Sequence, residues 1–346
     1  GRCVTGEPID VWTGEVVETL VDLCIAPPIG SPRQTLAPNL EGGGNGQLAF
    51  EFIREYSSGD ATDQLPFGRG WSHNFDQYIE FADEQLFLRK ADGRFLRLGR
   101  GLLEPPERPQ RLLYANLEIT RHQDQLRVSE LRGSRISTFS LVKREGPARW
   151  YLSAIVDRRG NGVDLYYEQL ERGPRLQRIT DRRGWSVQLD YGDHGCIRSA
   201  RLLRHDVGAA TPVELASVRY DYHETGELAQ VTDAAGVKTS YVYDGFHRIR
   251  RATLPLGAVV HWEYDASSFC KKSFVSGGSY HRELTRKDLN TTVVTGAAVA
   301  EEYRFGARGQ LLNKATLDGR VSEANTYDSE LQITQRVNAA GEAWQW

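Results

Sequence analysis

The histidines and cysteines are the residues of this chain that could bind a metal ion or act as a base or a nucleophile. The eight histidines are His73, His122, His194, His205, His223, His247, His261 and His281, and the four cysteines are Cys3, Cys24, Cys196 and Cys270. None of these histidines belongs to an HExxH segment, and no two cysteines form a CxxC pair, so the spacings typical of zinc sites are missing. His194 and Cys196 stand close in sequence, but they share a strand face only if the turn at Gly192–Gly195 permits it. We therefore expect no metal, no cofactor and reduced cysteines.

Two other pairs have the residue types of a catalytic site. Ser72 and His73 could act as nucleophile and base, and Glu301 and Glu302 as an acid and base couple. Neighbouring residues in a strand point to opposite faces, so neither pair can work together. There is no GxSxG segment either. We expect no catalytic residue and no enzyme activity, and we interpret Gly68, Gly70 and Trp71, just before Ser72, as part of an aromatic structural corner.

The overall composition excludes several classes of protein. The chain has 346 residues, with 43 basic and 46 acidic residues and a net charge of −3. Nucleic-acid binders and proteins that bind anionic membranes usually carry a basic excess. No run approaches the ~20 apolar residues of a membrane helix. The chain starts at Gly1 and contains no methionine, which suggests a processed or partial chain.

Short alternating segments separated by turn residues predict an all-β fold, because no amphipathic helix of convincing length occurs. We expect N-terminal strands over 1–26, a Pro/Gly-rich loop over 27–48, a β domain over 49–149 and repeats over 150–346. The segment Lys238–Arg250 is a typical unit of these repeats. Its Asp244-Gly245 pair predicts a tight hairpin turn, because glycine tolerates a positive φ and aspartate can accept bonds from its own backbone.

Two short motifs alternate along the second half of the chain and recur about every 21–24 residues. The first is an aromatic residue followed by an acid, and it occurs at Tyr167-Glu168, Tyr220-Asp221, Tyr243-Asp244, Tyr264-Asp265 and Tyr327-Asp328, with degenerate copies at Asp190-Tyr191 and Tyr303-Arg304-Phe305. The second is Asp-x-x-Gly, and it occurs at Asp157–Gly160, Asp181–Gly184 and Asp233–Gly236, with Asn338–Gly341, Leu254–Gly257 and Leu317–Gly319 in equivalent places. The spacing is irregular over 268–300. We expect the aromatic residue to pack across strands and the acid and glycine to shape turns.

This pattern resembles the Rhs family, also called YD-repeat proteins. The segments Gly6–Glu15, Tyr56–Ser58 and Phe67–Ser72 are similar to the domain that begins the Rhs core. The resemblance implies a spiral β-sheet that forms part of a hollow shell, a β-cocoon, around a C-terminal toxin. Family members often release this toxin with a self-cleaving protease marked by a DPxGxxxG-like stretch, and this sequence contains no Asp-Pro dipeptide.

The resemblance also implies partners and a location. The partners would be the remainder of the shell, the enclosed toxin domain, a secretion-apparatus spike protein and a chaperone, with no nucleic acid and no membrane. The protein would be made in the bacterial cytoplasm and then secreted or delivered into a target cell, often by type VI secretion in interbacterial competition. The alternative is an extracellular module whose repeated aromatic residues bind carbohydrate or a cell surface. The Arg158-Arg159 and Arg182-Arg183 turns could also face an acidic partner.

Overall fold

The computed structural model describes residues 3–5, 8–25, 50–103, 108–133, 135–142, 148–170, 173–192, 195–206, 208, 211–278, 280–296 and 299–345. The expected loop over 27–48 lies outside these ranges. Across the described residues the regular structure is β-strand with single turns of 3-10 helix, so the all-β prediction is confirmed. No helix in the described ranges is long and apolar enough to cross a membrane.

The N-terminal strands form small sheets. They are β1 (Val4–Thr5), β2 (Ile9–Asp10), β3 (Val17–Ile25), β4 (Phe50–Ser57), β5 (Gln64–Leu65), β6 (Gly68–Arg69) and β7 (Trp71–His73), with η1 (Ser58–Asp60) after β4. Strand β4 pairs with β3 on one side and with β7 on the other. We call the described part of residues 3–73 the inner segment. Next come β8 (Tyr78–Ala82), β9 (Gln85–Arg89), β10 (Phe95–Leu98) and η2 (Arg100–Leu102).

A continuous antiparallel ribbon follows, in which each strand pairs with the next. Its first strands are β11 (Gln110–Leu112), β12 (Leu117–His122), β13 (Gln125–Glu130), β14 (Ile136–Val142), β15 (Arg149–Val156), β16 (Gly162–Leu170), β17 (Gly173–Asp181), β18 (Trp185–Tyr191), β19 (Ile197–Arg204), β20 (Val213–Tyr222) and β21 (Leu228–Thr232), with η3 (Leu113–Ala115) after β11. The ribbon continues with β22 (Lys238–Tyr243), β23 (Ile249–Thr253), β24 (Val259–Tyr264), β25 (Cys270–Val275), β26 (His281–Asp288), β27 (Thr291–Gly296), β28 (Val299–Phe305), β29 (Leu311–Thr316), β30 (Val321–Tyr327), β31 (Ile333–Asn338) and β32 (Ala343–Gln345), with η4 (Pro255–Gly257) after β23. We call this ribbon the wall.

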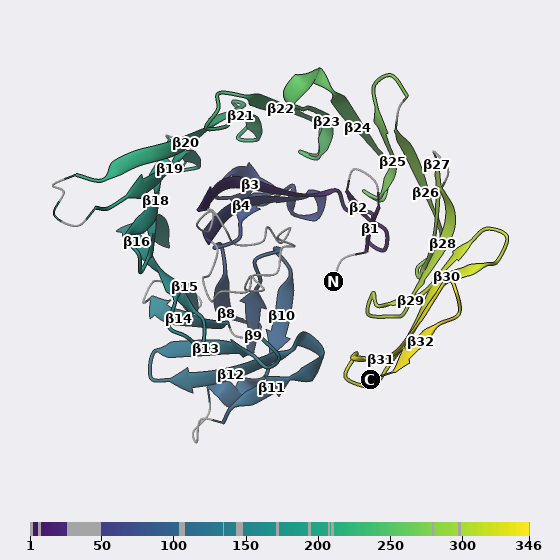
Figure 1. The fold of residues 1–346 in the computed structure, drawn as a ribbon, viewed down its shortest axis with the longest axis horizontal. Helices are drawn as coiled ribbons and strands as arrows, with labels where there is room; N and C mark the ends of the chain where they lie inside the picture. Colours follow the sequence, from purple (N-terminus) through teal and green to yellow (C-terminus); the bar gives the residue numbers. More distant parts are fainter. Residues whose placement is uncertain are drawn as a thin grey trace.

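The wall curves around the inner segment. Figure 1 shows β15–β32 as an arc with β1–β4 in its middle, and β8–β14 below them. Strand β15 also pairs with β8, so β8–β10 branch from the wall there. The boundary expected between residues 149 and 150 falls inside β15. The wall continues across it, because β15 pairs with β14 on one side and with β16 on the other. One continuous apolar core joins the two parts, from Ile9 and Phe52 of the inner segment to Phe305 of β28.

The turns of the wall share one aspartate motif. In the turn at Asp244, Oδ1 accepts the backbone N–H groups of Phe246 and Arg248, two and four residues later. The same carboxylate pattern recurs at Asp157, Asp181, Asp233, Asp265, Asp328 and, through its amide oxygen, Asn338. The hairpin turn predicted at Asp244-Gly245 is present, and Asp244 accepts bonds from its own turn as expected, but the role given to Gly245 was wrong. The loop has five residues, and the positive φ falls on His247 (63°), not on Gly245.

The repeat tyrosines form a ladder of backbone contacts. The hydroxyl of Tyr264 donates to the carbonyl of Ile249, 15 residues earlier, and Ile249 is the cross-strand partner of Tyr243. Tyr243 in turn donates to Leu228, the cross-strand partner of Tyr222. Tyr167, Tyr191, Tyr222 and Tyr327 make the corresponding bonds to Leu152, Leu176, Ile197 and Leu311. Each ladder tyrosine sits beside a register shift, so a β-bulge turns its ring toward the preceding hairpin.

The alignment of Tyr220-Asp221 with the other pairs was wrong, because Tyr222 occupies the ladder position. Tyr220 lies two residues earlier, and its hydroxyl donates instead to Asp22 of the inner segment. Asp221 lies inside β20 and faces Gln230 of the next strand rather than shaping a turn. The irregular spacing over 268–300 reflects an additional hairpin, β26–β27, which the structure places between Tyr264 and the ladder position of Phe305.

The ladder predicts a measurable cost for removing one hydroxyl. Replacing Tyr264 by phenylalanine leaves the Ile249 carbonyl without this donor and should lower the free energy of unfolding by about 1 kcal/mol. Urea denaturation followed by tryptophan fluorescence measures it. Tyr166→Phe is the matched control, since this side chain is 45 % exposed and lies beside a ladder tyrosine. Equal effects of the two substitutions would contradict a stabilising role for the ladder.

Candidate functional site at the contact between the inner segment and the wall

The turns of the wall lie alternately on its two edges. The tyrosine rim comprises the turns that follow the ladder tyrosines, at 223–227, 244–248 and 265–269, together with 306–310 and 328–332. The opposite rim comprises the turns at 157–161, 181–185, 233–237, 254–258, 316–320 and 338–342. In Figure 1 the tyrosine rim points toward the inner segment, whereas the opposite rim lies at the periphery. The tyrosine rim is therefore the edge of the wall that meets the N-terminal strands.

The Gly68–Trp71 loop docks on this rim. The indole Nε1 of the fully buried Trp71 donates to the hydroxyl of Tyr243 at 2.9 Å. A Cβ at Gly68 would lie 2.4 Å from the carbonyl oxygen of Gly226, and Gly68 has a φ of +87°. Only glycine allows this approach of two backbones. The structure thus brings the N-terminal motif Gly68, Gly70 and Trp71 against the repeat motif.

A buried ion pair lies beside Trp71. The Arg54 guanidinium binds the Asp22 carboxylate, with Nε to Oδ2 at 3.0 Å and side-chain exposures of 3 % and 5 %. From the wall, Tyr220 donates to Asp22 at 2.7 Å, and the Arg54 guanidinium contacts the Tyr241 hydroxyl at 3.4 Å. Arg54 also stacks 4.6 Å from the Trp71 ring. Burial alone would lower the pKa of Arg54, but Asp22 outweighs it and raises the pKa above its usual value.

A third contact fills the interruption of the ladder. The backbone N–H of Cys270 donates to the carbonyl of Gly14 at 2.9 Å, and a Cβ at Gly14 would lie 2.1 Å from the Phe269 ring. Arg286 of the additional hairpin donates to the carbonyl of Trp12 at 2.8 Å and stacks over Phe269. The turn at 12–14 therefore contacts the wall next to Cys270 and Arg286. At this position no tyrosine of the described residues continues the ladder.

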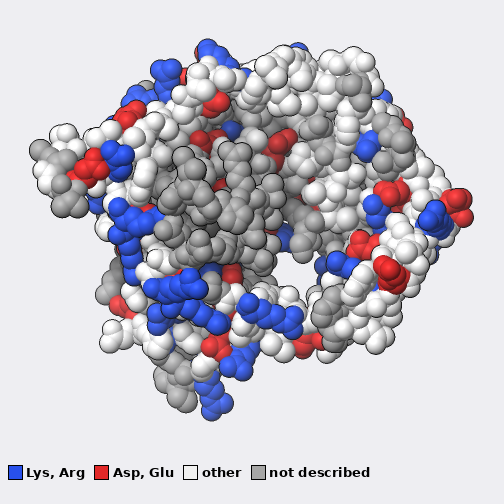
Figure 2. All heavy atoms as spheres, in the orientation of Figure 1, with Lys and Arg blue, Asp and Glu red and all other residues white. Residues whose placement is uncertain are grey.

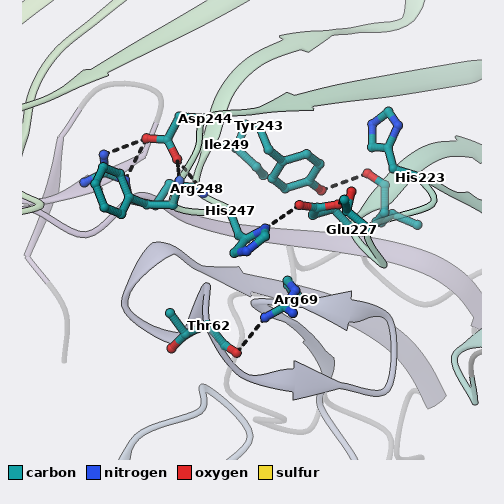
Figure 3. Close-up of polar contacts among 12 residues, drawn as sticks. Thr62, Arg69, His223, Glu227, Tyr243, Asp244, His247, Arg248 and Ile249 are labelled. Carbon is teal, nitrogen blue, oxygen red and sulfur yellow. Dashed lines mark hydrogen bonds and ion pairs between the residues drawn. The ribbon is translucent and has the colours of Figure 1, made fainter.

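Figure 3 shows two adjacent turns of the tyrosine rim that hold a carboxylate and a histidine. Nδ1 of His247 lies 2.5 Å from Oε1 of Glu227, and the Thr225 hydroxyl binds the other oxygen of Glu227. Burial of Glu227 opposes its ionisation, yet the hydrogen bonds from Thr225 and His247 lower the pKa of this carboxyl. Arg69 of the inner segment lies below His247 and donates to the Thr62 carbonyl at 3.0 Å. The Glu227–His247 pair connects two neighbouring hairpins of the wall, next to the place where the loop at Gly68 contacts Gly226.

His73 lies inside the inner segment, as the aromatic-corner interpretation requires. Its ring packs 5.4 Å from Phe52 and 6.0 Å from Phe67, and its Nδ1 has no hydrogen-bond partner among the described residues. Ser72 pairs with Glu55 in the sheet. Burial lowers the pKa of His73 to about 4. The histidine is thus a neutral core residue.

This burial predicts a loss of stability in acid. The unfolded chain binds a proton at His73 below the ordinary pKa of about 6.5, whereas the folded chain does not until about 4, so acidification favours unfolding across this interval. Between pH 7 and 4.5 the contribution should be about 2.5 kcal/mol. Urea denaturation of wild type and His73→Phe at both values measures it. The variant should lose less stability than the wild type by about that amount; parallel losses would show that His73 takes up its proton in the folded state.

Other candidates for chemistry remain apart. No group of three or more His, Cys, Asp or Glu side chains in the described ranges could hold a metal ion. All the cysteines are free thiols, and Cys196 accepts a hydrogen bond from Gln64 of the inner segment. Glu301 and Glu302 bind different cations, Lys314 and Lys287. His194 is outside the described residues. A cavity of about 750 Å³ lies between the inner segment and β9–β14, lined by Leu117, Val128 and Phe139 among others.

Comparison with known families agrees with this arrangement. Residues 222–259, which span the turns of Figure 3, match the family model described as RHS Repeat. Residues 40–98 match a domain of unknown function, DUF6531. These two parts of the chain thus resemble RHS-repeat proteins. The Gly68–Trp71 loop lies in the DUF6531 match, and the Tyr243 turn on which it docks lies in the RHS match.

The chain spans only a small part of the length of the relatives it matches. It is 28 % identical over 239 residues to double-stranded DNA deaminase toxin A of Burkholderia cenocepacia (strain H111), covering 67 % of this chain and 14 % of that protein. Among solved structures, TcdB2-TccC3 has a TM-score of 0.44 and 12 % identity, covering 97 % of this chain and 21 % of the other. The Photorhabdus luminescens Tc holotoxin pore has a TM-score of 0.42 and 13 % identity, covering 78 % and 20 %.

Proposed function

We propose that this chain forms one end of a protein shell that encloses a toxin domain. The observation that carries the proposal is the seating of the inner segment on the tyrosine rim, which gives a curved wall with one edge closed by the chain itself. An open passage remains between the inner segment and the last strands of the wall (Figure 2). Enclosure needs a wall that is stable and inert, and the interactions described above supply stability rather than catalysis.

The ladder argues against the alternative of a carbohydrate-binding module. An aromatic ring that binds sugar must present its face to solvent. The ladder tyrosines are packed against the core, and their hydroxyls are bonded to the backbone, as for Tyr243 and Tyr264. The wall therefore uses its repeated aromatic residues for its own assembly.

Protease protection tests the enclosure. In the gene product that contains this chain, the segment proposed as cargo should resist trypsin as long as the wall is intact. A variant that weakens the seat of the inner segment, such as Gly14→Ala, should make the same segment sensitive. Rapid cleavage of the cargo in the wild type, or rapid cleavage between the repeats of 150–346, would contradict the shell.

The finer parts of the proposal concern origin and delivery. We propose that the shell is made in the cytoplasm of a bacterium and delivered to a competitor through type VI secretion, with a spike protein and a chaperone as partners. The relative from Burkholderia cenocepacia is named as a toxin, which supports a toxin-associated role. Affinity purification from the native bacterium tests the route; recovery of the shell without any spike protein would speak against it.

A further inference from the structure

The cavity of about 750 Å³ between the inner segment and β9–β14 has two unlike sides. One side, which we call the floor, is apolar and takes one side chain from each of four strands. These are Leu88 of β9, Leu117 of β12, Val128 of β13 and Phe139 of β14. All four belong to the continuous apolar core of the protein. The floor is therefore the core face of this part of the sheet.

The other side, which we call the roof, is polar. Thr19 of β3, Glu55 of β4 and Ser72 of β7 form a row, because Glu55 is the cross-strand partner of both other residues. Ser57 lies two residues after Glu55 and therefore on the same face of β4. All of them line the cavity. The opposite face of β4 packs against the wall through Arg54, so the sheet β3–β4–β7 turns its hydroxyl groups and a carboxylate toward the cavity.

The floor and the roof do not complement each other. A sheet normally buries its apolar face against another apolar surface, and polar groups need hydrogen-bond partners when they leave water. The cavity volume lies within the range of about 300–1,000 Å³ that is usual for ligand sites. A ligand that fits must present apolar groups to the floor and hydrogen-bonding groups to the roof.

An extended polypeptide can meet both demands at once. Successive side chains of a strand point in opposite directions, so a segment between floor and roof turns every second side chain to each side. Apolar residues suit Leu117, Val128 and Phe139. The roof offers oxygen atoms that accept hydrogen bonds, so the remaining residues should be donors. A lysine or an arginine forms the stronger, charge-assisted bond to Glu55.

The charges around the cavity also favour a basic ligand. The described lining contains five acids and three bases. Two of these bases are bound to acids of the lining, Arg94 to Asp92 at 2.5 Å and Arg135 to Glu130 at 2.9 Å. The net charge of the described lining is therefore negative, and it attracts a ligand of the opposite sign.

We propose that this cavity binds an extended segment of the parent polypeptide in which apolar and basic residues alternate. The proposal rests on the proposed shell for the source of the segment, and it names a place where the shell holds it. The matched part of the Burkholderia cenocepacia relative makes up 14 % of that protein, which leaves ample chain for such a segment in proteins of this kind. A segment of the same polypeptide has a high effective concentration, so it fills a site that binds free peptide weakly.

Matched peptides test the cavity in this 346-residue chain. The probes are dye-labelled Leu-Lys-Leu-Lys-Leu, the acidic Leu-Glu-Leu-Glu-Leu, and Lys-Lys-Leu-Leu-Leu, which has the composition of the first without its alternation. Fluorescence anisotropy should show the alternating basic peptide binding at least about tenfold more tightly than either of the others. Equal affinities for the two basic peptides would overturn the proposal, as would tighter binding of the acidic one or no binding at all.

The substitution Glu55→Gln locates the bound peptide. It keeps the shape of the side chain and removes its charge, so the affinity for Leu-Lys-Leu-Lys-Leu should fall about tenfold. Glu263→Gln is the matched control, because Glu263 is exposed on β24, outside the cavity, and should leave the affinity unchanged. Circular dichroism checks that both variants are folded. Equal affinities of the two variants would place the peptide elsewhere and overturn the site.

The full gene product identifies the occupant. With its own segment in the cavity, it should bind Leu-Lys-Leu-Lys-Leu at least about tenfold more weakly than this chain does. Equal affinity would overturn the parent polypeptide as the source. Trypsin protection of the cargo in the same sample separates the two proposals. Protected cargo with equal peptide affinity leaves the shell standing and removes the occupant, whereas weak peptide binding with unprotected cargo does the reverse.

Discussion

Replacing Arg54 by methionine is expected to lower the free energy of unfolding by about 3–5 kcal/mol, because it leaves the Asp22 carboxylate buried without its cation. The loss should exceed that from trimming a core side chain of similar size, since Tyr220 and Tyr241 are positioned around the same charges. Urea denaturation gives the free energy, and tryptophan fluorescence, to which Trp71 on the guanidinium contributes, follows unfolding.

Two controls isolate the buried charge. Arg94→Met breaks the partly exposed pair with Asp92 and should cost less than about 1 kcal/mol. The double variant Asp22→Leu/Arg54→Leu removes both buried charges and should be more stable than Arg54→Met. If the double variant were no more stable than the single one, the cost would come from lost packing of the arginine stem.

Replacing Gly14 by alanine is expected to cost about 2–4 kcal/mol, the sum of a left-handed backbone and a displaced core ring. Gly14 has a φ of +73°, and the new Cβ would lie 2.1 Å from Phe269, whose ring is also stacked by Arg286. The turn at 12–14 would lift from the wall, taking with it the bond from the Cys270 N–H to the Gly14 carbonyl.

Gly236→Ala is the matched control for this substitution. Gly236 has a φ of +82°, but nothing lies within 4 Å of the added Cβ, so the substitution should cost only about 1 kcal/mol of backbone strain. The difference between the two variants measures the seat of the turn on Phe269. Equal losses would mean that the turn is not held against the wall.

The repeat pattern made the fold predictable, because turn chemistry and strand alternation act over short distances. The aspartates and glycines of the second motif, such as Asp181, Gly184, Asp233 and Gly236, lie at turns as expected. The hairpin turn at Asp244 was predicted, but the positive φ was expected at Gly245 because an Asp-Gly pair fits two kinds of turn. The Asp244 carboxylate accepts the backbone N–H groups of the residues two and four positions later, and this favours the five-residue loop with the positive φ on His247.

The ladder and the buried ion pair were harder to see in the sequence. Tyr220 and Tyr222 both fit the motif, and the bulge between Asp221 and Tyr222 decides which ring joins the ladder. Arg54 and Asp22 are 32 residues apart, and Asp22 falls at the register shift between Val21 and Leu23, so their pairing depends on a bulge in β3. The available signal for the ion pair was Arg54, a charged residue on the apolar face of a predicted strand, between Phe52 and Tyr56.

The ladder also gives the wall a direction of growth. Each ladder tyrosine reaches back 15 to 25 residues to a hairpin that is already made, as Tyr264 does to Ile249 and Tyr222 does to Ile197. Such local contacts close small loops and form early, so successive hairpins can join in the order of synthesis. The inner segment is made first but meets the wall late, since Tyr56 binds the backbone of a residue 193 positions later. During synthesis the N-terminal strands therefore remain without their contacts to the wall until the hairpins that they bind have been made.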